Sequence, residues 1–397
     1  MCFGILTLWV PDYWPVAVFE AGIFMLAAVV LWRSRKRLPG FSYPLVPLGF
    51  AVLLGLSQGL GGWTAYRFVT QAATVKWATF LAVFLIGICL FHDEPVRRWF
   101  RSAILWFSFV LAVVATLQTF SSGGKVFWLF PSGYSEYVMG PILYHNHYAA
   151  FIAAVLPIAL YQALRSEKDS LLYAAMAAAM YASVIASASR AGTILASAEI
   201  LTVIVLMQAR GRTARSAIGS SLVKIVLLLV VFAGVAGWEG VWNRFRAGDP
   251  MAIRAELASS SLHMIAAHPW SGIGLGAWST VYPRYAIVDI GAFANQAHSD
   301  WLEWTAEGGL PFGVIMASLF VWCLQPAFRT VWGLGVVAVF LLALVDYPFS
   351  RPALGSWTML ILAMLASAPR GYGKQAAERK RNILQPKSLQ NIPITIE

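Results

Sequence analysis

The sequence predicts an all-α fold: a polytopic membrane helix bundle of about 11–12 transmembrane helices with one small helical extracytoplasmic loop domain. Of the 397 residues, 59% are hydrophobic and 12% are charged, whereas about 25% of an ordinary soluble domain is charged. So little charge leaves too little polar surface to cover a water-soluble protein of this size. The hydrophobic residues also gather into long runs, and the basic residues between those runs are unevenly distributed. These three observations predict the fold class.

Eleven apolar runs approach the length of about 20 residues that a helix needs to cross a bilayer. They cover residues 15–32, 44–60, 71–91, 102–120, 147–164, 170–188, 191–208, 220–238, 309–325, 331–347 and 353–368. Charged segments separate most consecutive runs. The apolar residues 3–10 are too few to span a bilayer. They are interpreted either as an interfacial anchor or as the end of a twelfth helix that begins upstream.

The basic residues predict the orientation of the bundle, because cytoplasmic loops accumulate Lys and Arg. If the basic segment 33–37 is cytoplasmic, the alternation of spans places most of the 29 Lys and Arg on that side. This pattern predicts a multi-pass inner-membrane protein with a cytoplasmic C-terminus. The net charge of +11 is then a topology signal and a contact with the lipid bilayer, and no nucleic-acid partner is expected.

The same alternation divides the chain into four parts. The predicted parts are N-terminal transmembrane helices at 1–238, an extracytoplasmic loop domain at 239–308, C-terminal transmembrane helices at 309–368 and a basic cytoplasmic tail at 369–397. Within the loop domain, residues 254–267 have the pattern of an amphipathic helix. Residues 269–276, which read Pro-Trp-Ser-Gly-Ile-Gly-Leu-Gly, predict a flexible turn.

Three arginines on the predicted outer side are candidates for binding an anion. Arg190 lies between two apolar runs, where a charge is costly and indicates either a functional site or a side chain that reaches to the interface. Arg254 begins the amphipathic stretch, and Arg284 follows in the same loop. Each of these two alone is more simply a solvated charge. Together the arginines can form a phosphate site without a metal, because guanidinium groups bind phosphate oxygens in pairs.

His298 precedes a span and is a candidate general base, since histidine titrates near neutral pH. The alternative is an interfacial histidine that bonds to the backbone. Asp300, Glu303 and Glu307 share one helical face, and they could orient a base, act as one, or cap and solvate the helix. Asn146 opens another span between two histidines that point apart on a helix, so a neutral sugar or phosphate contact is expected there and a metal site is not.

Three segments in this order resemble the O-antigen ligase and O-antigen polymerase family of bacterial membrane glycosyltransferases, over roughly residues 140–325. The first is His145-Asn146-His147-Tyr148-Ala149-Ala150, and the second is Ser187-Ala188-Ser189-Arg190-Ala191-Gly192. The third runs from Arg254 through the turn at 269–276 to His298 and ends at residues 307–313. The chain departs from the family pattern at residues 259–261, where serines stand in place of a tryptophan.

The resemblance implies a cofactor-free and metal-independent transfer on the periplasmic side. The donor would be a glycan on undecaprenyl diphosphate, and the acceptor a hydroxyl of lipid A core, of another glycan or of a protein. Ligase, polymerase and protein O-oligosaccharyltransferase therefore remain open, within lipopolysaccharide or surface polysaccharide biosynthesis. In the family, the arginines matched by Arg190 and Arg254 are thought to hold the diphosphate, and the histidine matched by His298 to activate the acceptor. The rival classes are a transporter of lipid-linked glycans and a non-catalytic scaffold.

Overall fold

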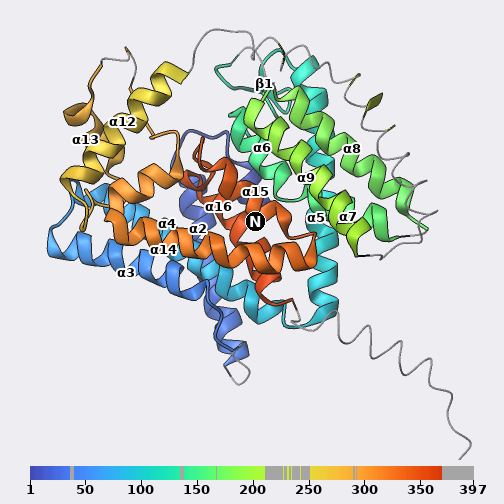
Figure 1. Cartoon of the computed structure of the whole chain (residues 1–397), viewed down its shortest axis with the longest axis horizontal. Coiled ribbons are helices and arrows are strands. Elements are labelled where there is room, and N and C mark those ends of the chain that lie inside the picture. The colour runs from blue at the N-terminus through green and yellow to red at the C-terminus, as the bar shows by residue number, and fades with distance from the viewer. Residues whose placement is uncertain are drawn as a thin grey trace, which may run out of the picture.

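The computed structural model of the chain describes residues 1–35, 40–134, 138–166, 168–210, 251–288, 291 and 293–368, with five isolated positions between 227 and 242. Over these residues the fold is all-α, as predicted (Figure 1). The helices are α1 Cys2–Leu6, α2 Trp14–Ser34, α3 Leu45–Gly61, α4 Arg67–Leu90, α5 Glu94–Ser121, α6 His145–Ala153, α7 Leu156–Arg165, α8 Ser170–Ala186, α9 Arg190–Ala209, α12 Met251–Ala267, α13 Trp278–Tyr285, α14 Asp300–Thr330, α15 Leu334–Leu342, η1 Pro348–Ser350 and α16 Pro352–Ala366. The described residues also contain a two-stranded antiparallel hairpin, formed by β1 Lys125–Val126 and β2 Phe130–Pro131.

Ten of the eleven predicted spans overlap these helices. The span at 220–238 lies outside the described residues apart from isolated positions, and the tail at 369–397 lies outside them entirely. Six described helical segments are long and apolar enough to cross a membrane: α2, α4, α5, α6 with α7, α9 and α14. The helices α3, α8 and α16 are apolar but shorter. These spans make the chain a multi-pass membrane protein.

Two predicted spans differ from the observed helices. The span 147–164 is broken between α6 and α7, where Pro157 stands in the first turn of α7. Proline lacks the N–H that would continue the helix and its ring collides with the carbonyl four residues earlier, so the helix restarts. The span 331–347 contains only the nine residues of α15, and the chain then turns through residues 346–347 into η1.

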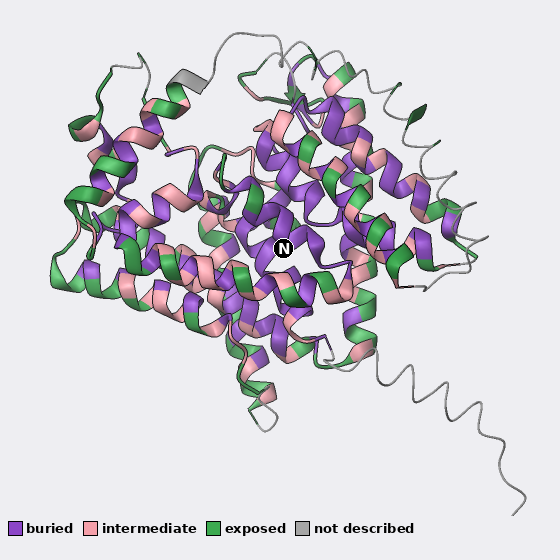
Figure 2. Cartoon of the chain, in the orientation of Figure 1, coloured by how far each residue is buried: buried purple, intermediate pink, exposed green. Residues whose placement is uncertain are grey.

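Buried residues concentrate in the centre of the bundle, where α6, α15 and α16 lie (Figure 2). Nearly every residue of these three helices is buried. A helix that is apolar on all sides is stable only when other helices or lipid surround it. The polar residues at the start of α6 are therefore enclosed by protein.

The predicted loop domain contains the helices α12 and α13, which pack together at one end of the bundle (Figure 1). The turn at 269–276 joins them. It was predicted to be flexible, but hydrogen bonds to other parts of the chain hold it in place. The Gln58 side chain donates to the carbonyls of Ser271 and Glu307 at 2.9 Å each and accepts from the Leu275 N–H. A Cβ at Gly272 would lie 2.2 Å from the Glu307 carbonyl oxygen, so glycine is required there.

Helix α14 begins at Asp300, nine residues before the predicted span at 309–325. The backbone departs from helical geometry at Gly309, with φ 74° and ψ 176°, a conformation open to glycine. The Leu310 N–H donates to the Pro269 carbonyl at 2.7 Å. The kink therefore fixes the first two turns of α14 against the loop domain.

Candidate functional site

The candidate site centres on Asp346, a fully buried carboxylate between α15 and η1. Its Oδ2 accepts hydrogen bonds from the Asn146 side-chain amide and, at 3.3 Å, from the Tyr144 hydroxyl. The Arg254 Nη2 lies 4.0 Å from the same oxygen. The Asp346 backbone carbonyl accepts from the Asp300 N–H at 3.0 Å. Three other segments that are distant in sequence therefore meet at Asp346.

Asn146 connects this carboxylate to the start of α9. Its Oδ1 accepts from the Ser189 hydroxyl at 2.6 Å, and Ser189 caps α9 by accepting from the Gly192 N–H at 3.1 Å. Arg190 is the first residue of α9 and is half-buried. The free N–H groups at a helix start favour a bound anion, so Arg190 and the helix end reinforce each other.

His298 lies directly before α14, and its ring packs edge-on against Tyr347, with centroids 4.9 Å apart. The ring of Tyr144 lies 6.4 Å away. The Nδ1 of His298 is buried and has no hydrogen-bond partner among the described residues. Burial, and then the positive charge of Arg254, lower the pKa of His298 to about 4. The imidazole is therefore neutral at pH 7 and able to accept a proton.

Two residues, one near Arg190 and the other the candidate His298 itself, adopt left-handed backbone conformations that non-glycine residues rarely take. Ala188 has φ 55°, and His298 has φ 53°. Such a conformation costs about 1–3 kcal/mol and persists only where surrounding contacts impose it, often at functional sites. Both strained positions lie in segments bonded to the polar cluster around Asp346.

Asp300, Glu303 and Glu307 are buried on one face of α14, and each accepts from a backbone N–H. Asp300 accepts from Phe349 at 3.0 Å, Glu303 from Ala297 at 3.0 Å, and Glu307 from Trp278 at 3.2 Å. They therefore hold the loops that frame the site, including the residue before His298. No bond from any of the three to the His298 ring occurs in the described chain, so their contacts favour positioning over proton transfer.

Arg284 differs from the other candidates. It is exposed in the last turn of α13. Within the described ranges it makes no ion pair or hydrogen bond with the residues around Asp346. The structure thus brings Arg254, Asn146 and His298 together, places Arg190 next to them through Ser189, and leaves Arg284 apart.

Sequence reasoning missed Asp346, together with its neighbours Tyr144 and Tyr347. One signal was available, because the predicted span 331–347 ends with a carboxylate in Val345-Asp346-Tyr347. An ionisable residue within an apolar run needs a partner and marks a functional position by default. The residues that contact Asp346 could not be predicted from the neighbouring sequence, since they lie in other segments of the chain.

Comparison with known families gives one match, which covers part of the chain. Residues 174–317 match the family model described as O-antigen ligase. No curated protein matches the chain. The matched range runs from α8 into α14 and includes Arg190, Arg254 and His298, whereas Asn146 and Asp346 lie outside it. The resemblance found in the sequence is confirmed: residues 174–317 of this membrane protein belong to the O-antigen ligase family.

Proposed function

We propose that the protein is a glycosyltransferase that moves a glycan from undecaprenyl diphosphate to an acceptor hydroxyl, without a metal. The observation that carries this proposal is the assembly of a neutral histidine, Arg254 and the Arg190 helix start around one buried carboxylate. The site and the loop domain at 239–308 would face the periplasm, as the charge distribution predicts. The products would belong to lipopolysaccharide or surface polysaccharide.

In this proposal the arginines bind the diphosphate of the donor. When the bond between the anomeric carbon and the diphosphate oxygen breaks, negative charge develops on the leaving diphosphate. Fixed guanidinium groups stabilise that charge most strongly in the transition state. Asp346 orients Arg254 from 4.0 Å, and it partly offsets the positive charge of the arginines. Asn146 bonds to Asp346 on one side of the site and to Ser189 on the other. Its direct contact with substrate stays a prediction.

His298 accepts the proton of the acceptor hydroxyl as the new carbon–oxygen bond forms. The Nδ1 of His298 is buried and lacks a hydrogen-bond partner in the described part of the chain, so its capacity to donate or accept a hydrogen bond is unused. A neutral imidazole is required for this step, and the lowered pKa provides it. The three carboxylates of α14 keep the His298 loop in place.

The test is transfer by the purified full-length protein in detergent, with an undecaprenyl diphosphate glycan and defined acceptors. We expect a glycosylated acceptor to form, and the yield to persist with a chelator present. A transporter of lipid-linked glycans would form no product once the membrane is dissolved. Lipid A core, a second lipid-linked glycan and a protein, offered in parallel, distinguish the ligase from a polymerase or a protein O-oligosaccharyltransferase.

The pH dependence of the transfer rate tests the state of His298. Because protonation removes the base, kcat/KM should stay constant down to acidic pH and fall only below about pH 4, where His298 gains its proton. The residual activity of Arg254→Gln should fall at a higher pH, because this variant lacks the positive charge of Arg254 that helps to lower the pKa of His298. A decline centred near 6.5 in both proteins would contradict the buried, neutral base.

A further inference from the structure

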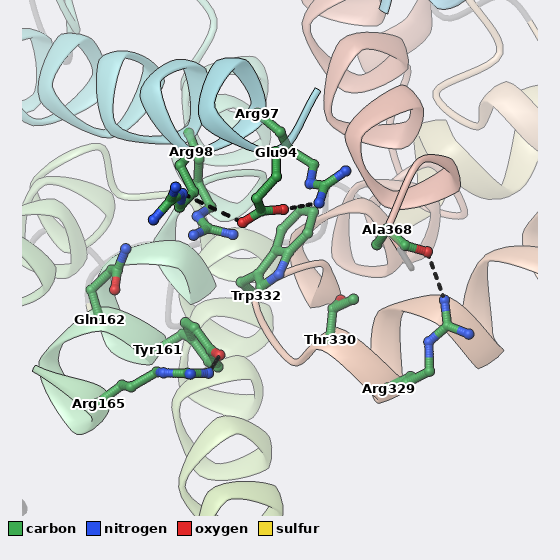
Figure 3. Close-up of a pocket in the computed structure, with 11 residues that line it drawn as sticks. Glu94, Arg97, Arg98, Tyr161, Gln162, Arg165, Arg329, Thr330, Trp332 and Ala368 are labelled. Carbon is green, nitrogen blue, oxygen red and sulfur yellow. Dashed lines mark hydrogen bonds and ion pairs between the residues drawn. The ribbon is translucent and has the colours of Figure 1, made fainter. Parts of the chain in front are cut away.

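A polar cavity lies at the opposite end of α14 from His298. It has a volume of about 230 Å³ and is lined by the first turns of α5 and the last turns of α7 and α14, together with Trp332 and Ala368 (Figure 3). Helix α14 starts at the candidate site and ends at this cavity. Beyond the kink at Gly309, residues 310–330 of α14 form a helix about 30 Å long. The cavity is therefore a separate site, and the charge distribution assigns it to the cytoplasmic side.

Arginine dominates the lining of this cavity. Five arginines face it, and Glu94 is the one carboxylate among its lining residues in the described chain. The arginines are Arg97, Arg98, Arg101, Arg165 and Arg329. They come from three helices that are distant in sequence, so the tertiary fold gathers positive charge there beyond what any single loop carries.

The arginines are held in different ways. Arg97 has a structural role, because it pairs with Glu94 and donates to the backbone carbonyls of Phe91 and Ser367 at 2.8 and 2.9 Å. Arg98 is 61% exposed and lies 3.5 Å from Glu94. Arg165 donates to the Tyr161 hydroxyl. A guanidinium group has five N–H donors, so Arg98 and Arg165 retain donors for a ligand.

Aromatic side chains in the cavity lining stack against two of the arginines. The guanidinium of Arg101 lies 5.5 Å from the ring centroid of the buried Trp332, and that of Arg165 lies 5.7 Å from the ring of Tyr161. Stacking on a ring fixes the plane of a guanidinium and therefore the direction of its donors. Arg329 donates to the Ala368 carbonyl at 3.4 Å, so α14 and the end of α16 close the opposite wall (Figure 3).

We infer that this cavity binds the phosphate group of an anionic phospholipid at the cytoplasmic surface of the membrane. Guanidinium groups bind phosphate in a bidentate manner, and basic pockets between transmembrane helices select anionic headgroups. The volume of about 230 Å³ lies below the range of about 300–1,000 Å³ for drug-sized ligands. A phosphodiester headgroup fits such a space, while the acyl chains remain among the surrounding helices.

Native mass spectrometry of the delipidated full-length protein tests this inference. Phosphatidylglycerol, phosphatidylcholine and inorganic phosphate are titrated separately. We expect one phosphatidylglycerol to bind about tenfold or more tightly than phosphatidylcholine, and the double variant R98Q/R165Q to lose that preference. The single variant R98Q, at an arginine whose side chain is 61% exposed, should lose part of it and covers the case that the double variant unfolds.

The matched control is R33Q/R35Q at the end of α2, which removes two exposed charges from the same predicted side but outside the cavity. It should bind phosphatidylglycerol as the unmodified protein does. Equal loss in both double variants would reduce the effect to general surface charge and overturn the inference. Binding of inorganic phosphate that displaces the lipid would also overturn it, and would assign the cavity to a soluble phosphate.

Discussion

Replacing His298 by alanine is expected to lower the rate of glycan transfer by about 10²–10⁴-fold, the usual contribution of a general base. The loss should appear in kcat, because the base acts as the acceptor is deprotonated. His298→Asn should have the same effect. Asparagine adopts the left-handed conformation more readily than other non-glycine residues, so a backbone change at φ 53° would not account for its loss. The measurement is product formation in detergent, with complementation of a ligase-deficient strain at normal protein level.

The control for this variant is His263→Ala. His263 is an exposed histidine on α12, the helix that carries Arg254. Its removal should leave the rate unchanged. Full transfer by His298→Ala at an unchanged protein level would exclude a catalytic role for His298 and would favour an interfacial histidine.

The second large effect is expected for the arginines, where lysine keeps the charge but not the planar fork. Arg190→Lys and Arg254→Lys should each lower kcat by about 10–100-fold, because a charge-assisted hydrogen bond contributes about 1.5–3 kcal/mol. For Arg254→Lys, the shorter reach to Asp346 adds to the loss. Steady-state kinetics with the lipid-linked donor measure both variants.

Arg284→Lys is the matched control, since Arg284 is exposed on α13 of the same loop domain. We expect its kcat and the donor KM to be unchanged. If Arg190→Lys also retained full activity, Arg190 would be an interface anchor. If both Arg190→Lys and Arg254→Lys did so, the proposal of a diphosphate clamp would be wrong.

The transmembrane helices could be predicted because each depends on a local quantity, the length of an apolar run. The errors arose where contacts or residues outside the length of an apolar run determine the backbone conformation. Pro157 breaks a predicted span. Gly309 bends α14 to meet the Pro269 carbonyl, and the shortness of α15 brings Asp346 into the interior.

The candidate site could be predicted only in part, for the same reason. Arg190, Arg254 and His298 were found because their residue types and order resemble a family. Asp346 was missed, because its importance follows from contacts with Asn146 and Arg254, which lie far earlier in the chain. The acidic face of α14 was predicted, but its burial was not. A helical pattern shows which residues share a face and does not show whether a loop covers that face.

The position of Asp346 also determines when the site can form during synthesis. Translation delivers Asn146, Arg254 and His298 to the membrane before Asp346, and the carboxylate that joins them arrives with the last described helices. Until then the buried amide of Asn146 lacks its acceptor, and the Asp300 carboxylate lacks the hydrogen bond that it accepts from the Phe349 N–H. Under the proposed function, a nascent or truncated chain that ends before residue 346 is therefore expected to consume no lipid-linked glycan, and transfer is expected to begin only once residue 346 is in place.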